Sequence, residues 1–340
     1  MVDTLSRKRK ATDEKECAFE VEVKTILNQV KDNAVTELSL CCIESLEEVV
    51  EIFNALKYNS SVTSINCNNN PIGVEGAAAI AEALKVNPTL TSLNLCNSGI
   101  GIEGAAAIAK ALKVNSSLLS LDLTRNNIGN EGTIAIAKSL KVNGTLLSIK
   151  LDGNLIETEG AIAIAEALKV NAILTSINIS SNYIDEEGQV AIAEMLKHNS
   201  TLTSITLAQS YIEEKGGAAI AEALKVNSTL TSLNLAVSSV AMQSVCRIIE
   251  ALKINSSLTS LNFFQSHFAA DEGFSFTEAL KALRFNPTLS TLLVGFDNNV
   301  CPKFTINTQH DLRSLLKPLI GNYGAELLAI DFRMRVRANQ

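Results

Sequence analysis

Residues 90–95 read Leu90-Thr-Ser-Leu93-Asn-Leu95, and blocks of this kind recur along the chain at an offset of 28 residues. The full copies follow one another without insertion or deletion, and they begin at Val62, Leu90, Leu118, Leu146, Leu174, Leu202, Leu230 and Leu258. Looser copies begin at Val35 and Leu289. A fixed period of this length is the signature of a solenoid, in which each repeat packs only against its neighbours.

The hydrophobic pattern changes within each repeat. In residues 118–123, Leu121 and Leu123 alternate with polar residues, which predicts a short strand with one buried face. Further along, Ile136 and Leu140 have the spacing of one face of a helix. Every strand follows its predecessor after the same crossover, so the strands must run parallel. The sequence therefore predicts an α/β solenoid of about ten strand–turn–helix repeats.

The expected helices also show how they begin and end. Glutamates stand early in several of the expected helices, at Glu75, Glu103, Glu131, Glu159 and Glu187, and a Lys-x-Asn triplet such as Lys85-Val-Asn87 follows the helix. These charges oppose the helix dipole at each end. Asparagine tolerates the left-handed conformation that is common at a helix C-terminus. The pattern therefore predicts C-terminal caps at Asn87, Asn115, Asn143, Asn171, Asn199, Asn227 and Asn255.

The pattern Leu-x-x-Leu-x-Leu-x-x-Asn-x-Ile, with a glycine and a helical apolar stripe downstream, resembles the leucine-rich repeat of the ribonuclease-inhibitor-like subtype. NOD-like receptor repeat regions and Ran GTPase-activating proteins contain similar repeats. The resemblance implies a horseshoe with a parallel sheet on its concave face and helices on its convex face. One position departs from the family pattern, because serine replaces asparagine at Ser98, Ser210, Ser238 and Ser266. A hydroxyl reaches fewer backbone groups than an amide, so water or an altered turn must compensate.

Four segments are expected along the chain. Residues 1–16 form a disordered polar tail, residues 17–34 an amphipathic capping helix, residues 35–300 the solenoid and residues 301–340 a C-terminal cap. Each end of a solenoid exposes an apolar face that a cap must cover. Within the last segment, alternating apolar and basic residues over 328–336 predict a terminal strand.

Arg7, Lys8, Arg9 and Lys10 form a basic run in the polar tail. Such a run resembles a nuclear localisation signal, and the alternative is a solubilising tail. Residues 1–19 contain no apolar leader, and no stretch of about 20 apolar residues follows anywhere in the chain. We therefore expect a protein of the cytoplasm, and of the nucleus if the basic run is functional, with no membrane contact.

The composition excludes several classes of function. Hydrophobic residues make up 46% of the chain and aromatic residues 4%, so the core must be aliphatic. A net charge of -7 argues against general nucleic-acid binding. Seven cysteines without a Cys-x-x-Cys pair indicate free thiols. His198, His267 and His310 match neither a metal site nor a catalytic triad. We expect no enzyme, no cofactor and no metal.

Charged residues on the outward side of the predicted strands mark a first candidate partner-binding surface. Asp122, Arg125, Lys150 and Asp152 come from two adjacent repeats in the middle of the solenoid. The alternative is a local ion pair between Asp122 and Lys150, which would contribute at most about 1 kcal/mol.

A second candidate surface follows the ends of later strands. Tyr183, Tyr211 and His267 stand at equivalent positions of their repeats, and Val237 and Phe264 are apolar where other repeats have polar residues. Tyrosine is a favoured anchor in protein interfaces. The alternative is that these side chains only pack against the turns.

The hypothesis that follows is a non-catalytic, monomeric protein-interaction module that holds a protein partner on its concave face or rim. The alternative from another class is a GTPase activator of the Ran type, which the resemblance implies. Those activators have an acidic C-terminal tail, whereas this chain ends with the basic segment 332–340. An assay of GTP hydrolysis by Ran would discriminate between the two.

Overall fold

The computed structural model describes residues 24–40, 45–263, 267–269, 283, 286–294, 303–306 and 329–332. Arg7, Lys8, Arg9 and Lys10, predicted to form the basic run, lie outside these residues, as does Phe264. The backbone of His267 is described and its side chain is not.

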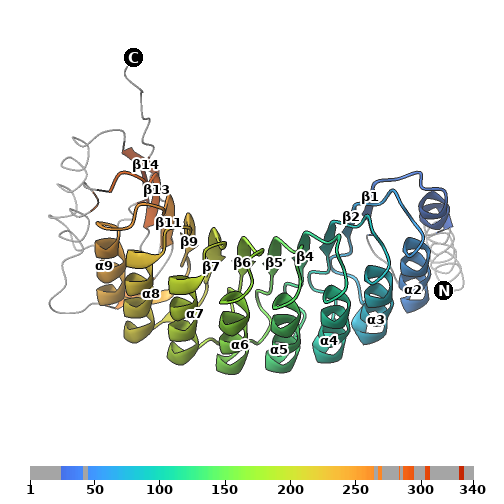
Figure 1. The fold of residues 1–340 in the computed structure, drawn as a ribbon, viewed down its shortest axis with the longest axis horizontal. Helices are drawn as coiled ribbons and strands as arrows, with labels where there is room; N and C mark the ends of the chain where they lie inside the picture. Colours follow the sequence, from blue (N-terminus) through green and yellow to red (C-terminus); the bar gives the residue numbers. More distant parts are fainter. Residues whose placement is uncertain are drawn as a thin grey trace, which may run out of the picture.

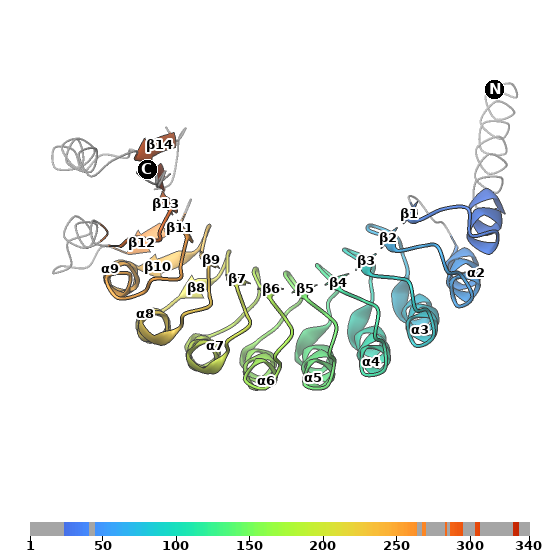
Figure 2. The same ribbon diagram turned by 45° about the horizontal axis from the view of Figure 1, so that its top comes forward.

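The described residues form a curved solenoid in which the strands line the concave side and the helices the convex side (Figures 1 and 2). This confirms the predicted α/β solenoid with parallel strands. The strands that enter the long sheet from the repeats are β1 (Glu37–Ser39), β2 (Ser64–Asn66), β3 (Ser92–Asn94), β4 (Ser120–Asp122), β5 (Ser148–Lys150), β6 (Ser176–Asn178), β7 (Ser204–Thr206), β9 (Ser232–Asn234), β11 (Ser260–Phe263) and β13 (Thr291–Val294).

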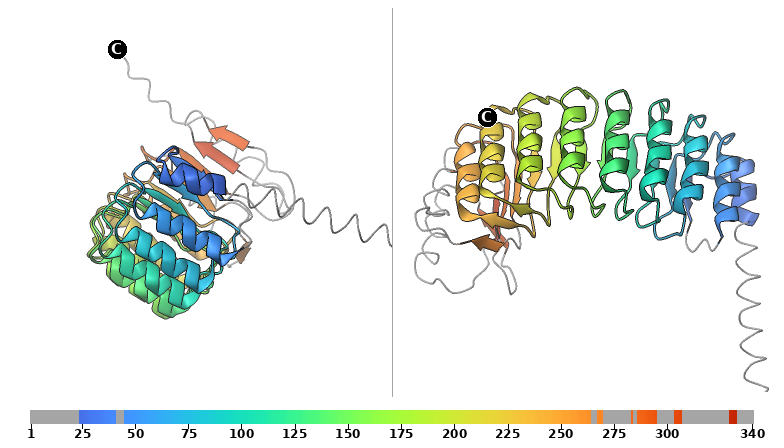
Figure 3. Two further views of the ribbon diagram at one scale, coloured as in Figure 1. Left: turned by 90° about the vertical axis from the view of Figure 1, so that its right-hand side faces the viewer. Right: turned by 90° about the horizontal axis from the view of Figure 1, so that it is seen from below.

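Helices connect consecutive strands and stand side by side along the convex face (Figure 3). They are α2 (Leu46–Leu56), α3 (Gly73–Leu84), α4 (Gly101–Leu112), α5 (Gly129–Leu140), α6 (Thr158–Leu168), α7 (Glu186–His198), α8 (Glu214–Val226) and α9 (Met242–Ala251). Glutamates stand in the first turn of several of them, as the sequence predicted, where they oppose the positive end of the helix dipole.

The repeat length sets the register of the sheet. Leu93 pairs with Leu121 in the neighbouring strand, and the same offset of 28 residues holds from β2 to β11. The spacing is 27 residues at the first crossover, where Glu37 pairs with Ser64, and 31 at the last, where Ser260 pairs with Thr291. Because side chains in a strand alternate, this register puts equivalent residues of all repeats on the same face.

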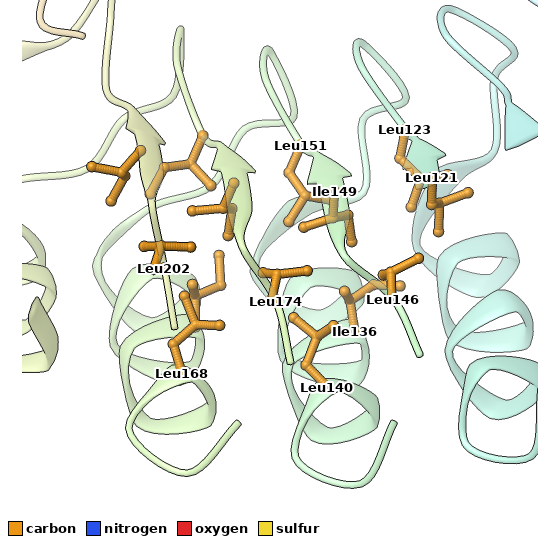
Figure 4. Packing of buried hydrophobic residues seen from close by; sticks show 14 of the residues in the cluster. Leu121, Leu123, Ile136, Leu140, Leu146, Ile149, Leu151, Leu168, Leu174 and Leu202 are labelled. Carbon is orange, nitrogen blue, oxygen red and sulfur yellow. The ribbon is translucent and has the colours of Figure 1, made fainter. Parts of the chain in front are cut away.

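The core is a continuous aliphatic layer between the strands and the helices (Figure 4). Leu121 and Leu123 point from β4 toward the helices, while Ile136 and Leu140 point from α5 toward the strands. All four are fully buried. The packing thus follows the two periodicities that the sequence shows.

The asparagines after the helices were predicted to be left-handed caps. Asn199 and Asn227 do stand at the C-caps of α7 and α8, but none of these asparagines has a left-handed backbone. Asn199 and Asn227 have extended backbones, with φ of −78° and −73°. These asparagines are buried and join neighbouring repeats instead. Asn143 is an example, because its Nδ2 donates to the Leu112 carbonyl at 2.7 Å and its Oδ1 accepts from the Leu146 amide at 2.8 Å. Hydrogen bonding between two repeats, rather than a left-handed backbone, explains why asparagine occurs there.

Left-handed backbone occurs instead where the chain leaves each strand. The residues that share this position are Asn69, Asn97, Arg125, Gly153, Ser181, Gln209 and Val237, with φ between 52° and 65°. Val237 is a β-branched residue, for which this conformation is unfavourable. The turn geometry is therefore common to the repeats although the residue type is not.

A second parallel sheet, which the sequence analysis missed, lies beside the later repeats (Figure 2). It consists of β8 (Tyr211–Ile212), β10 (Ser239–Ala241) and β12 (His267–Ala269). In earlier repeats an asparagine side chain forms hydrogen bonds with the main chain of this turn. Oδ1 of Asn182, for example, accepts from the Ile156 amide at 3.0 Å. Where serine takes that position, as at Ser210 and Ser238, backbone pairing between repeats replaces the amide. The turns at Ser210 and Ser238 are altered in this way, whereas no strand of the second sheet follows Ser98.

Further elements lie at the two ends. Residues 24–31 are helical and bury Leu27 and Val30 against the first repeat, within the segment predicted as the N-terminal cap. At the other end, β15 (Ala329–Phe332) runs antiparallel to β13 and pairs with β14 (Lys303–Ile306). The antiparallel pair marks the end of the repeating pattern.

Candidate interaction surfaces

The charged residues predicted in the middle of the concave face form a connected network. Nζ of Lys150 in β5 lies 3.0 Å from Oδ2 of Asp122 in the adjacent strand β4. The Asp122 side chain is largely buried and the Lys150 side chain is more than half exposed. The ion pair considered as the alternative is therefore present, and it leaves the ammonium group at the surface.

Asp152 joins this network through polar neighbours. Its Oδ1 accepts hydrogen bonds from Thr124 Oγ1 at 2.8 Å and from Asn178 Nδ2 at 2.9 Å. Thr124 Oγ1 also lies 2.6 Å from Asp122 Oδ1, so its single hydroxyl hydrogen stands between two carboxylates and is donated to one of them at a time. A partner would therefore meet a preordered polar surface across β4, β5 and β6.

The charges in this network shift nearby pKa values. The hydrogen bond and the charge of Asp122 raise the pKa of Lys150, which keeps the ammonium protonated. Cys96, one repeat earlier, has a raised pKa because of partial burial and then because of Asp122 and Asp152. The thiol is therefore kept in its protonated form, which is the unreactive one.

Arg125 lies at the left-handed position after β4, with φ of 55°, and its side chain is exposed. Its amide donates to the Asp152 carbonyl at 2.8 Å. A Cβ built on Gly153 would lie 3.1 Å from Arg125 Cγ. Glycine in the next repeat therefore leaves room for the arginine side chain to extend over the turn.

The second predicted surface lies where the strands end. We call Tyr183, Tyr211 and Val237 the tyrosine rim; their side chains are 68%, 64% and 45% exposed. Leu155 precedes them at the position equivalent to Tyr183 and is 46% exposed. In the second sheet, Ser239 pairs with Tyr211 on one side and with His267 on the other. The second sheet therefore connects the backbone of the tyrosine rim to that of His267. Turn packing alone covers only a minor part of each tyrosine side chain.

Two exposed leucines were missed by the sequence analysis. Leu119 and Leu147 directly precede β4 and β5, and they are 40% and 41% exposed. The signal was available, because other full repeats carry threonine at this position, as in Thr91 and Thr175. The leucines belong to the same two repeats as the charged network.

Among the described residues, no group of three or more His, Cys, Asp or Glu side chains is arranged to hold a metal ion. None of the helices in that part of the chain has the length and apolar character needed to cross a membrane.

Comparison with the curated proteins finds no match. Among solved structures, the chain is similar to the leucine-rich repeat-containing protein LegL7 from Legionella pneumophila, with 18% identity over 75% of this chain and 80% of that chain and a TM-score of 0.49. It is similar to the C-terminal domain of tropomodulin from Caenorhabditis elegans, with 14% identity over 54% of this chain and 93% of that chain and a TM-score of 0.34. A third similar structure is titled leiomodin-1 actin-binding site 2, with 23% identity over 53% of this chain and 76% of that chain and a TM-score of 0.23.

The family model described as "Leucine Rich repeat" matches residues 58–81, 86–109 and 114–137. These segments begin just after α2, α3 and α4 and include β2, β3 and β4 with most of the helix that follows each strand. The repeats that continue beyond them keep the same register of parallel strands and the same convex helices. The chain is a leucine-rich repeat protein.

Proposed function

We propose that this chain is a non-catalytic protein-interaction module that binds a protein partner through the tyrosine rim and the adjoining concave face. Leucine-rich repeat proteins generally act in protein–protein interaction. The observation that supports this surface is the high exposure of Tyr183 and Tyr211 in consecutive repeats. Tyrosine provides a large contact area and a hydroxyl, and it is enriched at the energetic centres of interfaces.

The surroundings of the two tyrosines favour binding without large rearrangement. The Tyr183 amide donates to the Ile156 carbonyl at 2.8 Å, and the Tyr211 carbonyl accepts from Gln189 Nε2 at 2.6 Å. The backbone that carries each ring is therefore held by a hydrogen bond to the preceding repeat. A preordered anchor loses little conformational entropy when it binds.

A helix in each full repeat supports the ribonuclease-inhibitor-like subtype, because such a repeat needs a helix rather than an irregular segment on the convex side. The net charge of -7 supports a protein partner over a nucleic acid. We further propose that the module acts as a monomer in the cytoplasm, and in the nucleus if Arg7, Lys8, Arg9 and Lys10 act as an import signal.

The experiment that tests the rim compares proteins captured from native lysate by the wild-type chain, by Tyr183→Ala/Tyr211→Ala and by Tyr58→Ala. Tyr58 is 88% exposed and follows α2, far from the rim, so it controls for the loss of an exposed ring. Proteins captured by the wild type and the control but lost by the double variant would then be purified and titrated by calorimetry. We expect at least about a tenfold weaker affinity for the double variant. Equal affinity for all three chains would rule out the rim.

A further inference from the structure

Leu119 and Leu147 interrupt a ladder of threonines that runs along the strand entries. The described threonines at this position are Thr63, Thr91, Thr175, Thr203, Thr231 and Thr259, and each donates its hydroxyl to the main-chain carbonyl of the preceding repeat. The Thr203 hydroxyl, for example, lies 3.1 Å from the Thr175 carbonyl oxygen. Leucine cannot make this bond and leaves apolar surface in water. Folding therefore gives no reason for leucine at these two positions.

The helices that precede these two leucines, α4 and α5, also depart from the pattern. A glutamate pairs with the lysine three residues later in α3, α6, α7 and α8, as in the 2.7 Å contact between Glu166 and Lys169. In α4 and α5 the glutamate is replaced by Lys110 and Lys138. Each then stands one turn before another lysine, Lys113 or Lys141, and the like charges repel.

These four lysines are exposed, and among the described residues none of them has an ion-pair partner. The helix dipole explains why lysine occurs at positions 113 and 141, because a positive charge is favoured at the C-terminal end of a helix. A lysine stands at the equivalent position in every full repeat. The dipole does not account for Lys110 and Lys138, because the other helices of the same kind carry Glu or Asn there and also have that dipole.

Both departures meet at one edge of the solenoid. α4 ends at Leu112 and β4 begins at Ser120, so the connection between them crosses the edge where helices end and strands begin. The next repeat does the same, and the Leu147 amide donates to the Leu119 carbonyl at 2.8 Å. α4 and α5 stand next to each other along the convex row (Figure 3). We call Lys110, Lys113, Leu119, Lys138, Lys141 and Leu147 the lysine–leucine edge.

We propose that the lysine–leucine edge binds an acidic segment of a protein partner that also carries apolar side chains. Its carboxylates would neutralise the unpaired lysines, and its apolar side chains would cover the two leucines. This inference rests on the proposed protein-interaction function, but it uses a different edge from the tyrosine rim. Exposed apolar groups on the same edge as several lysines that make no ion-pair contact fit such a segment, because both are satisfied on binding.

The test uses variants that restore the repeat pattern. Lys110→Glu/Lys138→Glu places glutamate where α3 and α6 have it, and Leu119→Thr/Leu147→Thr places threonine where the ladder has it. Both variants should therefore fold as well as the wild type, which circular dichroism and urea unfolding would verify. Lys253→Glu, at the end of a distant helix on the same side of its repeat, is the matched charge control.

The probe is a displayed library of random 12-residue peptides, selected on the wild-type chain and counter-selected on each restored variant. We expect enrichment of peptides with several Asp or Glu and at least one large apolar residue. A synthetic copy of the most enriched peptide should bind at least about tenfold more weakly to either restored variant than to the wild type or to Lys253→Glu. Its affinity should also fall with added salt.

Three results would overturn the proposal: no acidic enrichment, equal affinity for the restored variants, or tighter binding of phosphatidylserine vesicles or a 20-nucleotide single-stranded DNA than of any selected peptide. The selected peptide should bind equally to Tyr183→Ala/Tyr211→Ala. If an acidic peptide binds but the rim variant captures the same proteins as the wild type, the tyrosine rim is rejected and the lysine–leucine edge is supported. If the rim variant loses captured proteins but no acidic peptide is selected, the rim is supported and the edge is rejected.

Discussion

Asn143 joins its own repeat to the preceding one, because its side-chain amide donates to the Leu112 carbonyl at 2.7 Å. The equivalent asparagines Asn115 and Asn171 make the same bond to Leu84 and Leu140. Each is buried, so each forms part of a polar column inside the solenoid. The column satisfies main-chain carbonyls at the ends of helices that would otherwise lack a partner.

Replacement of Asn143 with Ala should therefore destabilise the chain. The change leaves the Leu112 carbonyl and the Leu146 amide without their side-chain partners inside the protein. We expect a loss of about 2–3 kcal/mol in the free energy of unfolding, measured by urea denaturation. Ser116→Ala, at an exposed position on the equivalent connection of the preceding repeat, should change it by less than about 0.5 kcal/mol. Equal stability of the two variants would contradict the structural role of the column.

A methyl group at Gly104 should also be destabilising. A Cβ on this residue would lie 2.8 Å from the Ala77 Cβ in the preceding repeat, and α3 and α4 would have to move apart. Gly104→Ala should cost about 1–3 kcal/mol. Gly144→Ala is the matched control, because a Cβ there meets no atom within 4 Å. That variant should be neutral or gain up to about 1 kcal/mol, since alanine restricts the unfolded chain. Thermal unfolding of both would decide.

The valine at position 237 should make the folded chain less stable than a residue that tolerates left-handed backbone. Its φ is 55°, which is unfavourable for a β-branched side chain. Val237→Asn should raise the free energy of unfolding by about 1 kcal/mol, while removing an apolar group from the tyrosine rim. Val114→Asn, at an exposed valine on a helix-to-strand connection whose φ is not positive, should give no such gain. A destabilised Val237→Asn chain would show that packing of the valine outweighs the backbone strain.

Cys67 should be protected from thiol reagents in the folded protein. Burial raises its pKa from 9.0 to about 12, so the thiol remains protonated at neutral and mildly alkaline pH. Because the folded pKa exceeds the unfolded one, the associated stability is present below pH 9 and is lost as the pH rises toward 12. Labelling with iodoacetamide at pH 8, followed by peptide mass spectrometry, should modify Cys96 before Cys67. In urea the two rates should converge; equal rates in the native protein would contradict the burial.

The proposed function also predicts that the purified chain leaves GTP hydrolysis by Ran at its intrinsic rate. Lys150 in the concave network is already paired with Asp122, and the candidate surfaces hold the features of an interface rather than a catalytic group. Release of phosphate from Ran-GTP, with and without the chain, measures this directly. Acceleration that depends on chain concentration would favour the GTPase-activator alternative.

Much of the architecture was predictable because it depends on local periodicity. Alternation at Leu121 and Leu123 placed the strand and its buried face, and the spacing of Ile136 and Leu140 placed the helix. The constant interval between repeats placed Asp122 beside Lys150 and aligned Tyr183 with Tyr211. Each of these follows from the geometry of one repeat applied again and again along the chain.

The three-dimensional structure alone revealed which groups in different repeats satisfy one another. A buried asparagine that binds the preceding repeat has the same local sequence as a helix cap, so Asn143 was misread. The second sheet at Tyr211 and Ser239 depends on backbone groups in separate repeats, and no hydrophobic alternation marks it. Burial and pairing across repeats are properties of the packed stack, because a hydrogen bond between positions about 28 residues apart exists only once both repeats are folded against each other.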